Sequence, residues 1–234
     1  MNQSSRPPAP AAATRLAPPA DQAALARVGA TVRKRLEADP VVYKIPTDEA
    51  EIFAVANFLD AAECARFIAI VDRVAKPSRA FDTDYAQNYR TSYSGDVDPA
   101  DPFVRMIERR ISDLLGLPPA CGETVQGQRY LPGQEFKPHN DWFWTNAHYW
   151  PAERKRGGQR SWTAMAYLNA VDEGGSTDFP TIGLSIPPQA GALLIWNNAR
   201  ADGKPNDATL HAGTPVIQGV KYVITKWFRT RKWG

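Results

Sequence analysis

The sequence has few cysteines and no long hydrophobic run. Two cysteines, Cys64 and Cys121, do not suggest the disulfide framework of a small secreted domain. Cys64 falls among apolar residues of a predicted helix, where we expect a buried thiol. No apolar stretch approaches the ~20 residues that a membrane span needs, and residues 1–14 lack the apolar segment of a secretory signal. We therefore expect a cytoplasmic protein with no membrane partner.

The sequence also lacks a strong excess of either charge. The net charge is +3, and residues 1–40 account for it with six basic and three acidic residues, so the rest of the chain is balanced. A nucleic-acid-binding module usually carries a clearly basic face. The one short basic cluster, at 154–156, is predicted to be a solvated loop. We therefore expect no nucleic-acid partner.

The length and the hydrophobic content predict one domain with a tail. A chain of 234 residues that is 43% hydrophobic can bury one sizeable core. Residues 1–20 are rich in Pro and Ala and are predicted to be disordered. Residues 21–122 are predicted to form a helical and strand support region, and residues 123–234 a β-rich core within the same domain.

Helical signals dominate the first half of the chain. Asp21 is predicted to cap a helix over 21–37, which Pro40 stops. A second helix is predicted over 60–74, with the reciprocal capping pattern of an acidic first residue and a Glu three residues later. The 3–4 spacing of apolar residues predicts a third helix over 98–115.

Strand signals dominate the second half. An earlier strand is predicted over 52–58, and 77–95 is predicted to be a polar loop. From residue 123 onward, alternating patterns bounded by turn residues predict short strands at 123–130, 162–168, 184–187, 192–196, 214–217 and 220–228. Helices followed by many short strands indicate an α+β, mainly β, jelly roll with supporting N-terminal helices.

Two histidines and one aspartate have the spacing of a metal site. On an extended strand, residues two apart point to the same face, so His139 and Asp141 can present an imidazole and a carboxylate to one point. An imidazole from His211 completes a two-histidine, one-carboxylate set, which occupies one face of octahedral iron(II) and leaves the other open. The third histidine, His148, lies in an aromatic run outside this pattern and is predicted to be a loop residue.

Lys221, ten residues after His211, is predicted to bind an anion. A strand beginning at Val220 places Lys221 on one face with Val223, Thr225 and Trp227. A lysine on a face that is otherwise uncharged needs an anion to offset the loss of its hydration. The carboxylate of a co-substrate would fill that role.

The pattern His139-x-Asp141, followed by His211-x-Gly-x-Pro-Val and then Lys221, resembles the iron(II)- and 2-oxoglutarate-dependent oxygenases, in particular their prolyl 4-hydroxylase branch. The resemblance covers roughly residues 50 to 230. It implies a double-stranded β-helix, the jelly roll of cupin-like proteins. Further matching segments follow in the same order at 90–92, 128–134, 158–160, 167–169, 174–180, 193–197 and 226–227.

The resemblance also implies a chemistry and a set of roles. Iron(II), 2-oxoglutarate and molecular oxygen would act together, with ascorbate restoring iron that has oxidised without turnover. His139, Asp141 and His211 would bind the iron, and Lys221 would pair with the far carboxylate of 2-oxoglutarate. Tyr130 and Thr177 match positions that hydrogen-bond this co-substrate.

The substrate implied by the resemblance is a prolyl residue in a peptide or protein. One departure bears on the substrate, because Arg229 stands where related peptidyl hydroxylases tend to carry a histidine. Five residues match positions near the substrate groove: Arg90, Ser92, Glu123, Arg160 and Trp227. Further aromatic residues would suit stacking on a proline ring: Tyr85, Tyr89, Tyr93, Trp142 and Trp144.

Two alternatives remain open from the sequence. The same chemistry could act on a free amino acid or a small metabolite. The chain could instead be a non-catalytic jelly-roll binding module with a vestigial metal site, although all the predicted metal ligands and Lys221 are present.

Overall fold

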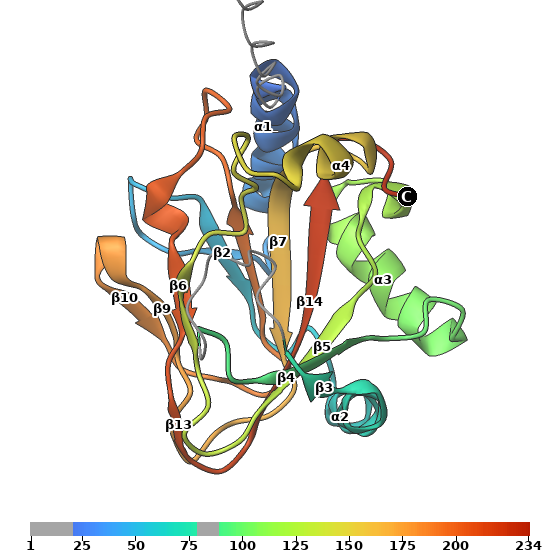
Figure 1. Cartoon of the computed structure of the whole chain (residues 1–234), viewed down its shortest axis with the longest axis vertical. Helices are drawn as coiled ribbons and strands as arrows, with labels where there is room; N and C mark the ends of the chain where they lie inside the picture. Colours follow the sequence, from blue (N-terminus) through green and yellow to red (C-terminus); the bar gives the residue numbers. More distant parts are fainter. Residues whose placement is uncertain (1–20, 79–88) are drawn as a thin grey trace, which may run out of the picture.

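A computed structural model describes residues 21–78 and 89–234 (Figure 1). The predicted disordered tail, 1–20, and the predicted stacking residue Tyr85 lie outside the described residues. The chain builds a large sheet and a smaller sheet that face one another, and helices pack against the outer face of the large sheet. The helices are α1 (Gln22–Ala38), α2 (Ala61–Val74), α3 (Pro102–Leu115) and α4 (Trp150–Lys155).

The helix ends follow local capping chemistry. The Asp21 side chain accepts from the backbone of α1, and Asp60 and Glu63 form a reciprocal capping box on α2, as predicted. The third helix starts later than predicted because the Asp101 side chain caps it. It ends where Gly116 takes a left-handed conformation, with φ of 68°. The prediction of a loop at 154–156 was wrong, since α4 includes most of this basic cluster.

The large sheet has eight strands. It accounts for the predicted strands at 123–130, 162–168, 192–196 and 220–228. In spatial order its members are β1 (Tyr43–Lys44), β2 (Ile52–Val55), β11 (Leu193–Asn197), β7 (Arg160–Tyr167), β14 (Lys221–Arg229), β5 (Gln126–Tyr130), β4 (Tyr93–Asp96) and β3 (Lys76–Pro77). β4 lies within the stretch predicted to be a loop, so that prediction was wrong at its C-terminal end.

The small sheet has four strands, and only β10 falls within a stretch where an alternating pattern predicted a strand. Its order is β10 (Leu184–Ile186), β9 (Thr177–Phe179), β12 (His211–Gly213) and β6 (Phe136–His139). β6 and β9 have four and three residues, which is too short for an alternating pattern to stand out, and β6 contains Pro138. A two-stranded pair, β13 (Val216–Gln218) with β8 (Glu173–Gly174), lies at one end. The strand predicted at 214–217 overlaps β13, whereas β12 ends before it, at Gly213.

Two hydrophobic cores lie on opposite faces of the large sheet. The outer core joins α1, α2 and α3 to the sheet through residues such as Leu36, Phe67, Ile107 and Trp162. Cys64 of α2 is buried there as a free thiol, as predicted. The inner core lies between the two sheets and includes Tyr167 of β7. Among the described residues, no helix is long and apolar enough to cross a membrane.

Candidate metal centre and co-substrate pocket

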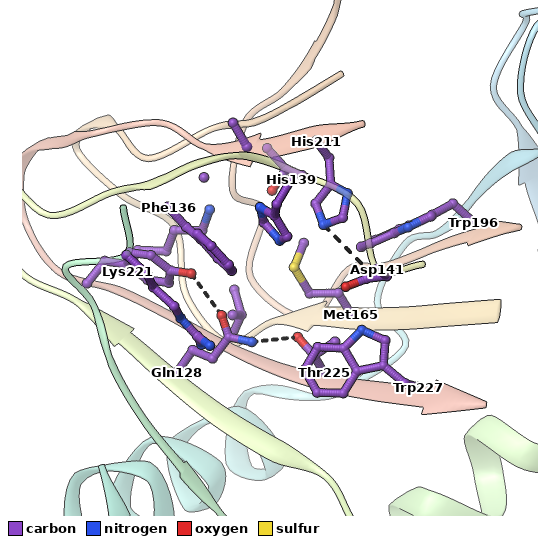
Figure 2. A pocket seen from close by; sticks show the side chains of 16 residues that line it. Gln128, Phe136, His139, Asp141, Met165, Trp196, His211, Lys221, Thr225 and Trp227 are labelled. Atoms are coloured by element: carbon purple, nitrogen blue, oxygen red, sulfur yellow. Dashed lines mark hydrogen bonds and ion pairs between the residues drawn. The ribbon is translucent and has the colours of Figure 1, made fainter. Parts of the chain in front are cut away.

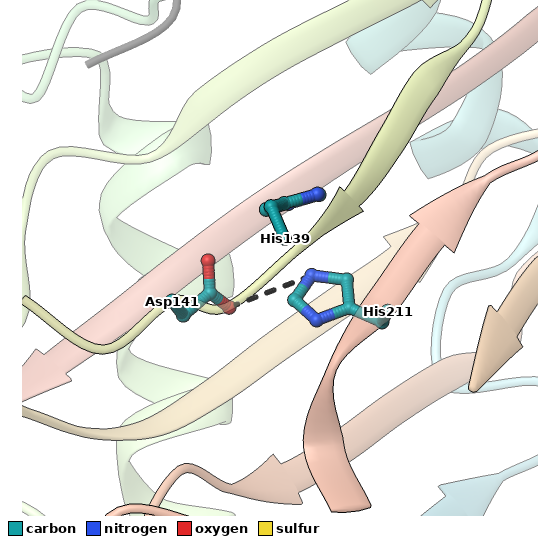
Figure 3. A group of neighbouring side chains, drawn as sticks. All are labelled: His139, Asp141 and His211. Carbon is teal, nitrogen blue, oxygen red and sulfur yellow. Dashed lines mark ion pairs between the residues drawn. The ribbon is translucent and has the colours of Figure 1, made fainter. Parts of the chain in front are cut away.

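Three side chains converge at the end of the small sheet: His139, Asp141 and His211 (Figure 3). Each offers one ligand atom, and these atoms lie within 4.8 Å of one another. His139 ends β6 and His211 begins β12, and the two are partners in the antiparallel register. His211 Nε2 lies 3.8 Å from Asp141 Oδ2. The structure therefore brings together the three residues predicted from the His-x-Asp and distal His pattern.

Asp141 reaches this point by a different route from the one predicted. The sequence argument placed His139 and Asp141 on one face of a continuous strand. β6 ends at His139, and Asp141 lies in the bend that follows. The carboxylate therefore needs support from elsewhere. Thr163 Oγ1 of β7 donates to Asp141 Oδ2 at 2.7 Å, and Arg160 Nη1 lies 3.8 Å from Asp141 Oδ1.

Backbone carbonyls fix both imidazoles in the same way. His139 Nδ1 lies 2.9 Å from the Lys137 carbonyl, and His211 Nδ1 lies 3.0 Å from the Thr209 carbonyl. A carbonyl can only accept, so each Nδ1 carries the proton and each Nε2 presents a lone pair. The Phe136 ring stacks on His139 with centroids 3.5 Å apart.

The surroundings keep His139 neutral. Burial lowers its pKa well below the usual range, and the neighbouring His211, Arg90 and Arg160 act in the same direction. A neutral imidazole is the form that binds a metal. Two imidazole nitrogens and one carboxylate oxygen then fit the facial set that suits iron(II) and leaves positions open. The donor set therefore fits the metal that the pattern implied.

A pocket extends from this centre into the space between the two sheets (Figure 2). One wall is the face of β14 that the sequence predicted, with Lys221, Val223, Thr225 and Trp227 in alternation, and all four side chains line the pocket. The remaining lining residues are Arg90, Gln128, Tyr130, Phe136, His139, Asp141, Met165, Thr177, Trp196, His211, Ala212 and Gly213.

Lys221 lies in the pocket away from the metal ligands. Its side chain is buried, and Nζ lies 5.4 Å from the centroid of the Tyr130 ring and 5.6 Å from that of Tyr167. Burial lowers the pKa of Lys221 to about 7, and the carboxylate of Asp178 opposes this only in part. Within residues 21–78 and 89–234, Nζ makes no hydrogen bond or ion pair. The geometry suits an anion that enters from the pocket.

Tyr130 and Thr177, the predicted co-substrate contacts, both line the pocket close to this lysine. The Tyr130 hydroxyl donates to Gln128 Oε1 at 2.8 Å, and Gln128 Nε2 donates to Thr225 Oγ1 at 3.1 Å. Thr177 Oγ1 accepts from the Tyr167 hydroxyl at 2.7 Å, so its own proton is available to the pocket. Sequence reasoning gave no role to Gln128 or Tyr167. Gln128 alternates with Tyr130 on β5, and Tyr167 alternates with Met165 on β7. This alternation could have predicted that both side chains face the pocket side of the sheet.

Arg90 and Ser92, predicted near a substrate groove, contact one another. Arg90 Nε donates to Ser92 Oγ at 3.1 Å, and Nη2 donates to Gln126 Oε1 at 2.9 Å. The guanidinium carbon lies 4.8 Å from the centroid of the Phe136 ring. Arg90 lines the pocket, whereas Ser92 is buried behind it.

Glu123, Arg160 and Trp227 form a second predicted group, and the structure joins it to Arg229. Arg160 binds Glu123 through two hydrogen bonds, of 2.7 and 2.9 Å, and its guanidinium carbon lies 4.1 Å from the centroid of a Trp227 ring. Arg229 binds both Glu123 and Glu153. Burial of Glu123 opposes ionisation, but the two guanidinium groups outweigh it and lower the pKa of this carboxyl. Of the predicted three, only Trp227 lines the pocket itself.

Three of the residues predicted to stack on a proline ring, Tyr93, Trp142 and Trp144, do not line the pocket, whereas Tyr89 packs edge-on against the pocket-lining Phe136, with ring centroids 6.4 Å apart. Trp142 is buried against Leu25 of α1 and Ala199, and Trp144 is exposed at the surface. Tyr93 lies beneath the guanidinium of Arg129 in the outer strands. The aromatic rings that line the pocket are instead those of Tyr130, Phe136, Trp196 and Trp227. His148 lies in the loop before α4, apart from the metal ligands, as predicted.

Comparisons with known proteins agree with this arrangement. Residues 125–229 match the model of the 2OG-Fe(II) oxygenase superfamily. The chain is 33% identical over 211 residues to the probable prolyl 4-hydroxylase 8 of Arabidopsis thaliana, an alignment that covers 80% of this chain and 71% of the relative. It is 34% identical over 205 residues to prolyl 4-hydroxylase 5 of the same plant, covering 75% and 67%.

Solved structures give the same result. The viral collagen prolyl hydroxylase of Paramecium Bursaria Chlorella virus-1, in its 2OG complex, matches with a TM-score of 0.61 and 28% identity, covering 76% of this chain and 95% of that one. A prolyl-4-hydroxylase of Pseudomonas putida, 20% identical with a TM-score of 0.53 over 87% and 99% of the two chains, shares the fold.

The chain therefore belongs to the 2OG-Fe(II) oxygenase superfamily, in its prolyl 4-hydroxylase-like branch. It is a 2-oxoglutarate-dependent dioxygenase by family, and the predicted mainly β jelly roll with supporting helices is confirmed.

Proposed function

We propose that this protein hydroxylates a prolyl residue in a peptide or protein, with iron(II), 2-oxoglutarate and molecular oxygen. The proposal rests on one pocket that contains both a metal-binding set and a basic side chain for the co-substrate carboxylate. Two imidazoles with free Nε2 atoms and a carboxylate converge in it. The buried amino group of Lys221, which has no hydrogen-bond or ion-pair partner among the described residues, lies in the same pocket. The prolyl substrate is supported by the relatives, which are named prolyl 4-hydroxylases.

The proposed roles follow from the atoms that face the pocket. His139 Nε2, His211 Nε2 and the Asp141 carboxylate would hold iron(II). With iron and 2-oxoglutarate bound, one oxygen atom of O2 enters the substrate C–H bond as hydroxyl, and the other enters the succinate that forms with release of CO2. The protein supplies ligand geometry, orientation and exclusion of water.

Lys221 would bind the far carboxylate of 2-oxoglutarate, which offsets the loss of its own hydration. Thr177 has a proton to donate to the same carboxylate, and Tyr130 forms the adjacent wall. The apolar lining, which includes Met165 and Val223, would keep water from the reacting atoms.

The predicted groove residues take two kinds of role in this proposal. Arg90 and Trp227 line the pocket and would contact the substrate. Ser92 would hold the Arg90 guanidinium in place, since its hydroxyl accepts from Nε. Glu123 would do the same for Arg160, whose guanidinium lies over the Trp227 ring.

Two further parts of the proposal rest on the sequence and the family resemblance. We infer that ascorbate restores iron that has oxidised without turnover, as the resemblance to prolyl 4-hydroxylases implies. We also infer a cytoplasmic location, because the described cysteines, Cys64 and Cys121, are free thiols.

A peptide-library assay tests the proposal. The protein is incubated with iron(II), 2-oxoglutarate, ascorbate and peptides that differ in the residues around proline, and succinate and peptide mass are measured together. We expect succinate formation that depends on a proline-containing peptide and a gain of one oxygen on that proline. If succinate formed only with a free amino acid or a small metabolite, that compound class would be the substrate instead of a peptide. If no candidate substrate gave succinate, the result would favour the alternative of a non-catalytic jelly-roll binding module.

A further inference from the structure

The Asp141 carboxylate depends on a hydrogen-bonded chain that runs into the large sheet. Thr163 Oγ1 donates to Asp141 Oδ2 at 2.7 Å, and Asn198 Nδ2 donates to Thr163 Oγ1 at 3.0 Å. All three residues are buried, with exposed fractions of 5% for Asp141, 0% for Thr163 and 2% for Asn198. No water is needed to link them.

The direction of this chain is fixed by its last member. The amide nitrogen of Asn198 can only donate, so the Thr163 oxygen accepts from it. The Thr163 proton is then free to point to Asp141, and an ionised carboxylate can only accept it. The rotation of the Thr163 hydroxyl is thereby set, and its hydrogen bond fixes the orientation of the Asp141 carboxylate.

The two ends of the hydrogen-bonded chain lie in different surroundings. Asn198 follows β11, and its backbone is held on both sides, since its N–H donates to the Ser161 carbonyl at 2.8 Å and its carbonyl accepts from Asn206 N–H at 3.2 Å. Thr163 lies within β7, between β11 and β14. Asp141 lies outside any strand. The chain therefore ties a ligand on a bend to the most central strands of the large sheet.

This arrangement matters because the metal ligands come from two places. The two histidines are fixed by the pairing of β6 and β12 in the small sheet. The carboxylate is fixed through Thr163 by the large sheet on the other side of the pocket. A shift of either part would separate the ligand atoms.

We propose that Thr163 and Asn198 are positioning residues for the metal centre, with Thr163 orienting the Asp141 carboxylate and Asn198 orienting Thr163. Neither side chain needs to touch the metal or the substrate. The inference rests on the proposed metal site, and it adds a second layer of residues to it. Loss of an outer hydrogen bond of this kind typically lowers metal affinity about 10- to 100-fold.

The test is a metal titration that does not require turnover. Manganese(II) affinity of the full chain is measured without 2-oxoglutarate, and the visible absorption of the cobalt(II)-loaded protein reports ligand geometry. The variants are Thr163→Val, which removes the donor at nearly constant volume, and Thr163→Ser, which keeps it. Ser161→Ala is the matched control, because Ser161 is a buried hydroxyl of the same strand that donates to the Phe228 carbonyl instead of a ligand.

We expect Thr163→Val to bind manganese about 10- to 100-fold more weakly, with an altered cobalt(II) spectrum. Thr163→Ser and Ser161→Ala should stay within about threefold of the wild type. The manganese affinity of Asn198→Ala should lie between those of the wild type and Thr163→Val. The double variant Thr163→Val/Asn198→Ala should lose no more affinity than Thr163→Val alone, since both residues act through one hydrogen-bonded chain. Asn198→Ala and the serine variant keep the test valid if Thr163→Val does not fold.

Wild-type manganese affinity in Thr163→Val would overturn the inference and leave the proposed function intact, provided the wild type forms succinate. An equal loss in Ser161→Ala would also overturn it, because general loosening of β7 would then explain the effect. Failure of the wild type to bind manganese would overturn the proposed metal site and the inference with it.

Discussion

His139 and His211 are direct partners across the antiparallel pair β6 and β12. Their ring centroids lie 4.2 Å apart, and each Nδ1 is bound to the carbonyl two residues earlier in its own chain. One local arrangement is therefore used twice, and one nitrogen of each ring lies within 4.8 Å of a carboxylate oxygen of Asp141. Figure 3 shows the His211 ring facing that carboxylate. The pairing of two short strands thus brings the two histidines together.

Replacing a proposed ligand should abolish turnover and leave the fold intact. His139→Ala, Asp141→Ala and His211→Ala each remove one of three donor atoms, whereas most of the core lies elsewhere. The measurement is succinate formation, with thermal unfolding to check the fold and His148→Ala as the control. Near wild-type succinate formation in any of the three would exclude that residue as a ligand. Zinc or manganese in a purified sample would be compatible, because metal availability helps decide which ion fills a site.

Sequence patterns predicted the site best where side-chain types repeat at a fixed spacing. The alternation of Lys221, Val223, Thr225 and Trp227 correctly predicted one wall of the pocket. No alternating pattern marks β6, because its four residues include Pro138 and remain half-exposed, so only the His-x-Asp spacing indicated a strand there. That spacing did not show that Asp141 leaves the strand.

Long-range partners could not be predicted. Arg160 and Arg229 both bind Glu123, from 37 and 106 residues away in the chain. The residues next to Glu123 in the sequence do not indicate which basic residue will contact it. The same holds for Thr163 and Asn198, whose contact depends on the pairing of β7 with β11.

Removing the Lys221 ammonium should weaken 2-oxoglutarate binding and spare the metal. Lys221→Ala leaves the far carboxylate buried without a partner, which costs roughly 3–5 kcal/mol. That corresponds to about a hundred- to several-thousand-fold in co-substrate affinity. Lys221→Arg keeps the charge but is longer and forked, so it should recover only part. The measurement is the apparent 2-oxoglutarate constant at saturating iron. An unchanged constant in Lys221→Ala would move the anchor elsewhere, with Arg90, another basic residue that lines the pocket, as the next candidate.

The affinity for 2-oxoglutarate should fall as the pH rises above about 7. Burial lowers the pKa of Lys221 to about 7 when no anion is bound, and only the protonated form pairs with the carboxylate. Binding must then take up a proton, so affinity should decline by up to about tenfold per pH unit above that pKa. The decline ends at the higher pKa of the bound state. Calorimetry in buffers of different ionisation enthalpy measures the proton uptake, and Lys221→Arg is the control, since its charge does not titrate in this range. Equal affinity at pH 7 and pH 9 would contradict the prediction.

The first twenty residues should be dispensable for the chemistry. They are rich in Pro and Ala and lack the apolar content to build a core of their own. A chain that begins at Asp21 keeps the N-cap of α1, whose side chain accepts from Ala24 N–H at 2.8 Å. We expect full activity of this shortened chain on a small peptide and a thermal midpoint within a few degrees of the full chain. Loss of folding on truncation would show that the tail packs on the body.

The buried Lys221 should make the protein less stable without 2-oxoglutarate than with it. Its folded-state pKa lies below the ordinary value of 10.5, so between about pH 7 and that value the unfolded chain holds a proton that the folded chain lacks. Folding is therefore penalised most below pH 7, and stability without 2-oxoglutarate rises as the pH increases through this window. An anion that pairs with Nζ removes the penalty and adds its own binding energy. Protein without 2-oxoglutarate would then be lost to unfolding and proteolysis faster than protein saturated with it, so the co-substrate would act as a stabiliser as well as a reactant.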